Sequence, residues 1–166
     1  PYGYLRIYKF NRKNFKLLDK IRLHKLTICA VQVHEKNLIT WSLSGDISAF
    51  SIKSYRKKFN TRIYNLRFNT ITRINEKFHM FDINGNLITF DPNNFNLSMF
   101  SFDFYPINDV AADNSHLYVL TSNERISALR VTNNRAPYFE YDIHIHPSFP
   151  TEIFQLRGYI LSLIHI

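Results

Sequence analysis

The chain has little cysteine and no long apolar run, and these two shortages exclude whole classes of protein. A single cysteine, Cys29, excludes an internal disulfide framework and points to a reducing compartment, so we predict a cytoplasmic location. No stretch approaches the roughly 18 uninterrupted apolar residues that a membrane-spanning helix needs. With 45% hydrophobic and 20% charged residues, the 166-residue chain instead has the composition of a soluble globular protein.

Motifs of common enzyme and cofactor sites are also missing. The chain has four glycines, and neither a glycine-rich phosphate loop nor a Gly-x-Ser-x-Gly elbow. Asp142, His144 and His146 alternate along a predicted strand and share one face, a spacing that zinc accepts, but no fourth ligand is evident. We predict His24 to be a structural, hydrogen-bonded histidine and Cys29 to be a small core residue. No catalytic, cofactor-binding or metal-binding residue is therefore predicted, and no enzyme activity.

What the sequence does contain is an internal repeat of about 40 residues. One column of similar segments recurs at spacings of 42, 40 and 39 residues, counted at Leu5, Ile47, Leu87 and Ile126. A second, independent column recurs at spacings of 40, 39 and 42 residues and begins at Leu38, Phe78, Leu117 and Tyr159. Because the two columns keep the same offset through the first three copies, we interpret them as paired strands of one repeating unit.

Each repeat is predicted to contain four short strands. Ser44-Gly45 and Asn84-Gly85 supply the residues that tight turns between paired strands demand. No stretch of ten or more residues has helical periodicity. Four short strands in a unit of about 40 residues are typical of a propeller blade. We therefore predict an all-β fold, a partial β-propeller of about four blades of four antiparallel strands, with an antiparallel sandwich as the alternative.

The two ends of the sequence bear on its domain organisation. Pro1 stands where a start methionine is expected, and residues 161–166 resemble the translation of a sequencing adapter. We expect residues 1–160 to be a β-propeller fragment whose first blade lacks its inner strands and whose last blade lacks its outer ones, followed by an adapter-derived tail at 161–166. An open ring leaves strand edges unpaired, so we also expect poor solubility.

One repeat in particular resembles the WD-repeat family. It contains Leu23-His24, the strand Leu38 to Trp41 and the turn Gly45-Asp46, which are similar to the family's opening Gly-His, its middle strand and its turn. Phe90-Asp91 stands in the place of the closing Trp-Asp of the next repeat. The resemblance covers nearly the whole chain through degenerate motifs. It implies a propeller that serves as a rigid platform for other proteins.

The same segment is also similar to pyrroloquinoline-quinone-type repeats. Gly45 to Phe50 fits their Gly-x-Leu-x-Ala-aromatic strand, and Phe59, Phe100 and Phe139 stand near the place of their outer-strand tryptophan. This second resemblance implies a quinoprotein-like propeller enzyme or assembly factor. Such a protein needs acidic metal ligands and cofactor-binding residues near the ring axis, and the sequence shows no convincing set.

The net charge of +8 is concentrated in the first part of the chain. Residues 1–70 hold fifteen Lys and Arg against three acids, whereas residues 71–166 hold six against ten. Six basic residues fall at or just after the third-to-fourth-strand turns of two successive blades: Arg12, Lys13, Lys53, Arg56, Lys57 and Lys58. They are candidates for one shared rim that attracts an acidic partner, an anionic membrane or nucleic acid. We favour the interpretation that these charges deter edge pairing and keep the protein soluble.

Together, these features predict a protein–protein interaction scaffold that is part of a larger WD-repeat-like propeller protein. Its expected partners are other proteins, among them ones with acidic surfaces, and not small molecules. Two alternatives stay open, the quinoprotein-like enzyme or assembly factor and a basic-rim binder of anionic membrane or nucleic acid. No signature of a nucleic-acid-binding fold accompanies the charge.

Overall fold

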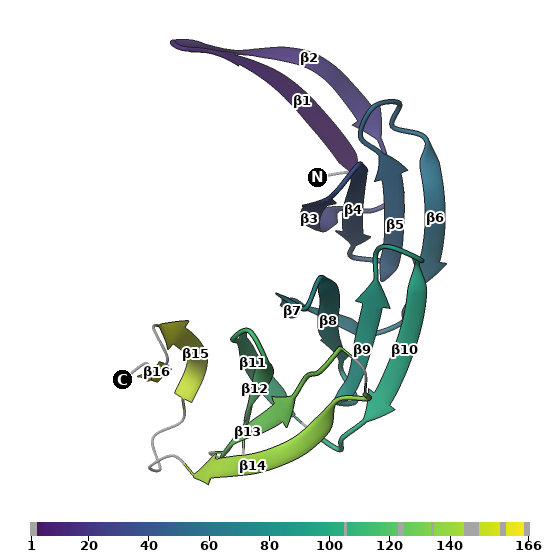
Figure 1. Ribbon diagram of the computed structural model, residues 1–166. Coiled ribbons are helices and arrows are strands. Elements are labelled where there is room, and N and C mark those ends of the chain that lie inside the picture. Colours follow the sequence, from purple (N-terminus) through teal and green to yellow (C-terminus); the bar gives the residue numbers. More distant parts are fainter. Residues whose placement is uncertain are drawn as a thin grey trace. The chain divides into compact units, whose positions relative to one another are not determined.

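The computed structural model describes residues 3–104, 106–122, 125–133, 135–144, 150–156 and 159–164. For residues 67–69, 150–156 and 159–164 it describes the backbone alone. The chain divides into two compact units, an N-terminal unit of residues 1–64 and a C-terminal unit of residues 65–166. Every regular element in these ranges is a β-strand (Figure 1). No helix in the described part is long and apolar enough to cross a membrane.

The N-terminal unit consists of a two-stranded hairpin followed by a four-stranded antiparallel sheet. The hairpin strands are β1 (Tyr4–Asn11) and β2 (Asn14–Arg22), and the sheet strands are β3 (Ile28–His34), β4 (Asn37–Ser42), β5 (Asp46–Ser51) and β6 (Lys57–Arg62). Gly45 makes the β4–β5 turn with a φ of +79°, and a Cβ atom there would overlap the carbonyl of Ile63. Glycine is therefore required at this turn.

An apolar cluster holds the hairpin against its sheet. Leu23, Leu38 and Phe50 are buried together, and Leu5 and Ile21 of the hairpin pack against them. The amides of Leu23 and of the next residue both donate to the Gly3 carbonyl, over 2.8 and 3.1 Å. These bonds fix the start of β1 beside the end of β2.

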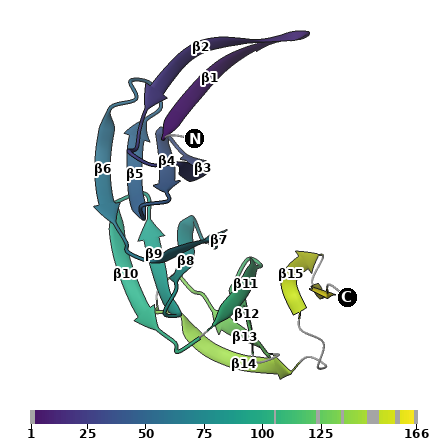
Figure 2. The ribbon, with the colours of Figure 1, turned by 180° about the vertical axis from the view of Figure 1, so that it is seen from behind.

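The C-terminal unit contains two four-stranded antiparallel sheets and a second hairpin. The first sheet comprises β7 (Leu66–Ile74), β8 (Lys77–Asp82), β9 (Asn86–Asp91) and β10 (Asn96–Ser101). The second comprises β11 (Ile107–Ala112), β12 (His116–Thr121), β13 (Arg125–Arg130) and β14 (Tyr138–His144), and the hairpin strands are β15 (Pro150–Leu156) and β16 (Tyr159–Ile164). β11 lies beside both β7 and β15, so the first strands of successive sheets are neighbours (Figure 2).

Apolar side chains cover both faces of the middle strands in this unit. Leu117 and Val119 of β12 belong to a core shared with the first sheet, whereas Tyr118 and Leu120 belong to a second cluster on the opposite face. A strand buried on both faces is expected where each sheet lies between two others. The described structure thereby confirms the predicted all-β fold of four-stranded antiparallel blades.

Cys29 contradicts its sequence-based prediction. Its side chain is exposed and not part of the core. The reason is that β3 is an edge strand, bonded to β4 alone, and Cys29 is the extra residue of a β-bulge between Ile28 and Ala30. Its apolar neighbours in the sequence indicated neither the edge position nor the bulge.

β16 crosses the predicted boundary between residues 160 and 161. It pairs with β15 up to Ile164, which lies opposite Pro150. This pairing does not test the origin of the last residues. The division into a β-propeller fragment and an adapter-derived tail stays a prediction.

Candidate interaction surface

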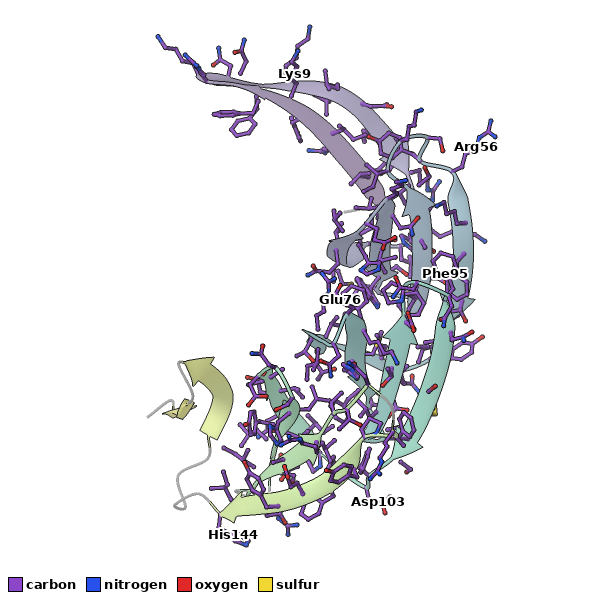
Figure 3. All side chains as sticks on the ribbon, in the orientation of Figure 1. Lys9, Arg56, Glu76, Phe95, Asp103 and His144 are labelled. Carbon is purple, nitrogen blue, oxygen red and sulfur yellow. The ribbon has the colours of Figure 1, made fainter. Side chains whose placement is uncertain are left out.

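Positive charge in the N-terminal unit far exceeds negative charge. Residues 1–64 hold fourteen Lys and Arg against three Asp and Glu, a balance of +11. The structure places Arg12 and Lys13 in the β1–β2 turn and Lys53 and Arg56 in the β5–β6 connection, all exposed. Figure 3 shows Arg56 at that connection and Lys9 on the hairpin. That the two turns form one binding rim stays a prediction.

The remaining two predicted residues lie on β6 and contact uncharged groups. The Lys57 ammonium lies 5.5 Å from the centre of the Phe50 ring. Lys58 Nζ donates to Asn37 Oδ1 over 2.7 Å. Within the described ranges, no carboxylate pairs with either lysine or with any of the other four predicted residues. Their charge therefore remains available to an external anion.

Large apolar side chains lie exposed on the β1–β2 hairpin among these charges. The rings of Phe10 and Phe15 face each other across the two strands at 4.8 Å, yet they are 62% and 72% exposed. Tyr8, Leu17 and Leu18 on the same hairpin are also exposed. Exposed aromatic groups beside cations are typical of protein-binding surfaces. Sequence reasoning missed this surface because an apolar strand pattern is taken as evidence of burial.

A basic pocket of about 410 Å³ lies between the end of the hairpin and the β3–β6 sheet. Arg22, Lys25, Lys57 and Arg62 line it, and its one acidic group is Asp46. Of these cations the sequence analysis had singled out only Lys57. Arg22 and Lys25 lie at and just after the end of β2, and Arg62 ends β6, so they meet only because the hairpin packs on the sheet. The excess of charge in residues 1–70 was the one available signal.

The acidic group of this pocket, Asp46, forms an ion pair with Arg62. Its Nε donates to Asp46 Oδ1 over 2.8 Å, and Ser44 Oγ donates to Asp46 Oδ2 over 2.5 Å. These contacts, the one from Arg62 above all, lower the pKa of Asp46 from 3.8 to about 2 despite its partial burial. Asp46 is therefore ionised and paired at neutral pH, which leaves three cations without a carboxylate in the pocket lining.

His24 has the buried, hydrogen-bonded setting that the sequence predicted. Its Nε2 lies 2.6 Å from Thr40 Oγ1, and its ring meets the Phe50 ring edge-on. The Thr40 hydroxyl in turn donates to the Ser48 carbonyl over 3.4 Å, so it accepts from the histidine ring. Burial lowers the pKa of His24, with a smaller opposing effect of Asp46. The neutral ring thus links β4 to the segment that precedes β3.

The residues of β14 whose spacing would suit zinc include Asp142, and this carboxylate is already paired with an arginine. Asp142 accepts from Ser127 Oγ over 2.6 Å and from Arg125 over 3.1 Å. His144 is exposed, and His146 lies outside the described residues. Where side chains are described, no three metal-binding side chains are grouped together.

Comparison with known proteins gives structural likeness and no sequence match. No family model matches the chain, and no curated protein matches it. Solved structures similar to it include BamB from Moraxella catarrhalis (TM-score 0.62, 11% identity, 83% of this chain and 39% of that one). The N-terminal domain of Nup159 gives a TM-score of 0.66 at 10% identity, over 91% of this chain and 42% of that one.

A chain of the mitotic checkpoint complex is similar to the same extent, with a TM-score of 0.67 at 8% identity over 92% of this chain and 49% of that one. The chain thus spans less than half the length of the three similar chains. At these identities the likeness concerns the fold alone. Together with the four-stranded antiparallel sheets, it identifies the fold as a partial β-propeller.

Proposed function

We propose that this chain is part of a protein–protein interaction scaffold, a cytoplasmic WD-repeat-like propeller protein without enzyme activity. It binds an acidic protein surface through the β1–β2 hairpin and the β5–β6 connection. The observation that carries the proposal is the combination of unpaired cations, such as Arg12 and Lys13, with the exposed rings of Phe10 and Phe15. One similar structure is of a multi-protein assembly, the mitotic checkpoint complex, which supports a scaffold role.

Charge and apolar contact have separable roles on this surface. The cations attract an acidic partner over a distance of about a Debye length, roughly 8–10 Å at ordinary salt. The aromatic rings gain by removal from water only when the partner approaches closely. A nucleic acid or a membrane surface would respond mainly to the first effect. A protein partner responds to both.

The test measures binding of fluorescent probes to the 166-residue chain by anisotropy. The probes are a random copolymer of glutamate and tyrosine, polyglutamate, a DNA duplex and vesicles that contain phosphatidylserine. We expect the copolymer to bind more tightly than polyglutamate and more tightly than DNA or vesicles at the same salt concentration. Tighter binding to DNA or vesicles would overturn the proposal in favour of the basic-rim alternative.

Two sets of variants separate the two effects. Replacing Arg12, Lys13, Lys53 and Arg56 by Gln removes four side chains that pair with no carboxylate in the described structure, and we expect it to weaken copolymer binding at least about tenfold. The control, with Gln at Lys36, Arg73, Arg125 and Arg130, loses the same charge elsewhere. Phe10→Ser/Phe15→Ser is expected to reduce binding of the copolymer to the level of polyglutamate. Equal binding by all variants would refute the assignment of this surface.

A further inference from the structure

A pocket of about 260 Å³ lies in the C-terminal unit and shares no residue with the surface described above. One wall belongs to the β7–β10 sheet, and the other is formed by residues 131–133 and 135–137 of the β13–β14 connection. This connection has seven residues, whereas the corresponding ones have five (52–56) and four (92–95). The extra length supplies the second wall of the pocket.

The first wall departs from the repeat. His79, Thr89 and Ser98 lie opposite one another on β8, β9 and β10 and form a polar row that lines the pocket. The corresponding rows of the other two four-stranded sheets are Ile39, Ala49 and Phe59, and Tyr118, Ala128 and Tyr141. A buried polar residue where the repeat has an aliphatic or aromatic one breaks the local pattern, and such departures concentrate at functional sites.

Two buried polar atoms of the pocket make no hydrogen bond of good geometry in the described structure. His79 is 2% exposed, and its Nδ1 lies 3.0 Å from Thr89 Oγ1, but its Nε2 makes no hydrogen bond of good geometry. Thr132 Oγ1, on the opposite wall, is unpaired as well. Unpaired buried polar atoms lower stability, so a ligand that pairs with them gains free energy. Burial also lowers the pKa of His79 to about 4, with a smaller opposing effect of the Ile74 backbone, so the ring is neutral at physiological pH.

Lys77 and Arg135 make the pocket cationic. Each of the other basic side chains described in this unit has a carboxylate partner: Arg73 with Glu76, Arg125 with Asp142 and Arg130 with Glu140. Lys77 and Arg135 have none within the described residues, and no acidic side chain lines the pocket. Two unpaired cations in a unit that is otherwise acidic therefore meet at one concave site.

The rest of the lining is apolar. Phe100 of β10 and Val131 and Pro137 of the β13–β14 connection contribute to the same pocket. A concave site with an apolar floor and a few convergent polar groups is typical of small-ligand sites. The two cations and the two unpaired polar atoms favour a ligand that is anionic and has hydrogen-bonding atoms.

We propose that this pocket binds a carboxylate carried on a compact apolar body, with Lys77 and Arg135 contacting the carboxylate and Phe100 and Val131 contacting the body. The unpaired atoms of His79 and Thr132 receive hydrogen bonds from, or donate them to, the same ligand. Two sources supply this chemistry, a free organic acid and the carboxylate end of a peptide. This pocket lies in a different unit from the proposed scaffold surface, uses different residues and binds a different class of ligand. The proposal differs from the prediction made from the sequence, which expected no small-molecule partner.

The test titrates the whole chain with benzoate and follows the imidazole ¹⁵N signals of His79 and the heat of binding. We expect saturable binding that shifts the Nε2 signal of His79. Lys77→Gln/Arg135→Gln is expected to weaken benzoate binding at least about tenfold, since it removes charge-assisted hydrogen bonds. Arg125→Gln/Arg130→Gln loses the same charge outside the pocket and is expected to bind benzoate within about twofold of the unmodified chain.

Two further probes define the ligand. Benzamide has the same shape without the charge, and equal binding of benzamide would overturn the need for a carboxylate. Acetyl-glycyl-phenylalanine and its C-terminal amide test the peptide source. Tighter binding of the peptide acid assigns the pocket to a chain end, and tighter binding of benzoate assigns it to a free acid. Absence of saturable binding by benzoate and by the peptide acid, or equal loss in both double variants, would overturn the proposal.

Discussion

Asp46 and Arg62 stand opposite each other at the first residue of β5 and the last of β6, and their side chains form an ion pair of 2.8 Å. The pair ties the outermost strand to the rest of its sheet at the end away from the β5–β6 connection. Next to it, the Ile63 amide donates to the Gly45 carbonyl over 2.9 Å. The C-terminal end of β6 is thus held both by this ion pair and by a backbone hydrogen bond to the β4–β5 turn.

The low pKa of Asp46 predicts a loss of stability in acid. Its folded value of about 2 lies below the ordinary 3.8, so the contribution is fully present above pH 3.8 and disappears as the pH falls toward 2. Because Arg62 is partly exposed, we expect about 1–2 kcal/mol from Asp46 after solvent screening. Urea unfolding followed by the fluorescence of Trp41, the one tryptophan, measures it. Asp46→Asn should be less stable than the unmodified chain at pH 7 and nearly equal to it at pH 2.

The His79 ring predicts a pH dependence at higher pH. Its pKa falls from 6.5 to about 4 on burial, so the unfolded chain binds a proton that the folded chain does not between these values. The contribution of His79 to the free energy of unfolding is fully present above about pH 6.5. We expect that free energy to drop by up to about 3 kcal/mol as the pH falls to 4. His79→Leu should remove the part of the pH dependence of the unfolding free energy that comes from His79, measured by urea unfolding followed by circular dichroism. The part that comes from His24, whose pKa is also lowered by burial, should remain. An unchanged slope would contradict the assignment.

The two turn glycines predict large losses of stability on substitution by alanine. Gly45 and Gly85 have φ angles of +79° and +82°, and a Cβ atom at either would overlap a backbone carbonyl, that of Ile63 or of Phe104. Gly45→Ala and Gly85→Ala should each lower the free energy of unfolding by at least about 2 kcal/mol. Leu43→Ala, in the same turn as Gly45 but exposed, is the control and should change it by less than about 0.5 kcal/mol.

The exposure of Cys29 predicts that the folded protein reacts with thiol reagents. Its Sγ lies 3.7 Å from the Thr27 carbonyl, and partial desolvation raises its pKa, so the reaction should be slower than that of a free thiol. Titration with a chromogenic disulfide should label one thiol per chain without denaturant. If labelling required urea, Cys29 would be buried in the folded protein, and the prediction would be wrong.

The repeat period was enough to predict the strands and their pairing. The Ser44-Gly45 and Asn84-Gly85 turns, with apolar segments on either side, place β4, β5, β8 and β9 correctly, because tight turns and strand alternation are local properties. Which strand face is covered is a tertiary property, and for this reason the burial of Cys29 was predicted wrongly. The exposed rings of Phe10 and Phe15 were missed for the same reason.

The two pockets could not be predicted from the sequence for a different reason. Arg22 and Arg62 are 40 positions apart and line one pocket only through the packing of the hairpin on the sheet. His79 and Arg135 meet through the packing of neighbouring sheets. One signal was present in the sequence: His79 and Thr89 are polar in columns where the other copies have Ile39, Ala49, Tyr118 and Ala128.

The seven-residue β13–β14 connection has a consequence for how such a fold acquires binding sites. The strands on either side pair with a register shift like that of β5 and β6, so the second wall of the pocket comes from the length of one turn and not from a different sheet architecture. Insertions at turns are tolerated because they leave the hydrogen-bonded ladder intact. A repeat fold can therefore evolve a ligand site in one unit while its neighbours conserve their packing, which makes turn length an inexpensive source of functional diversity.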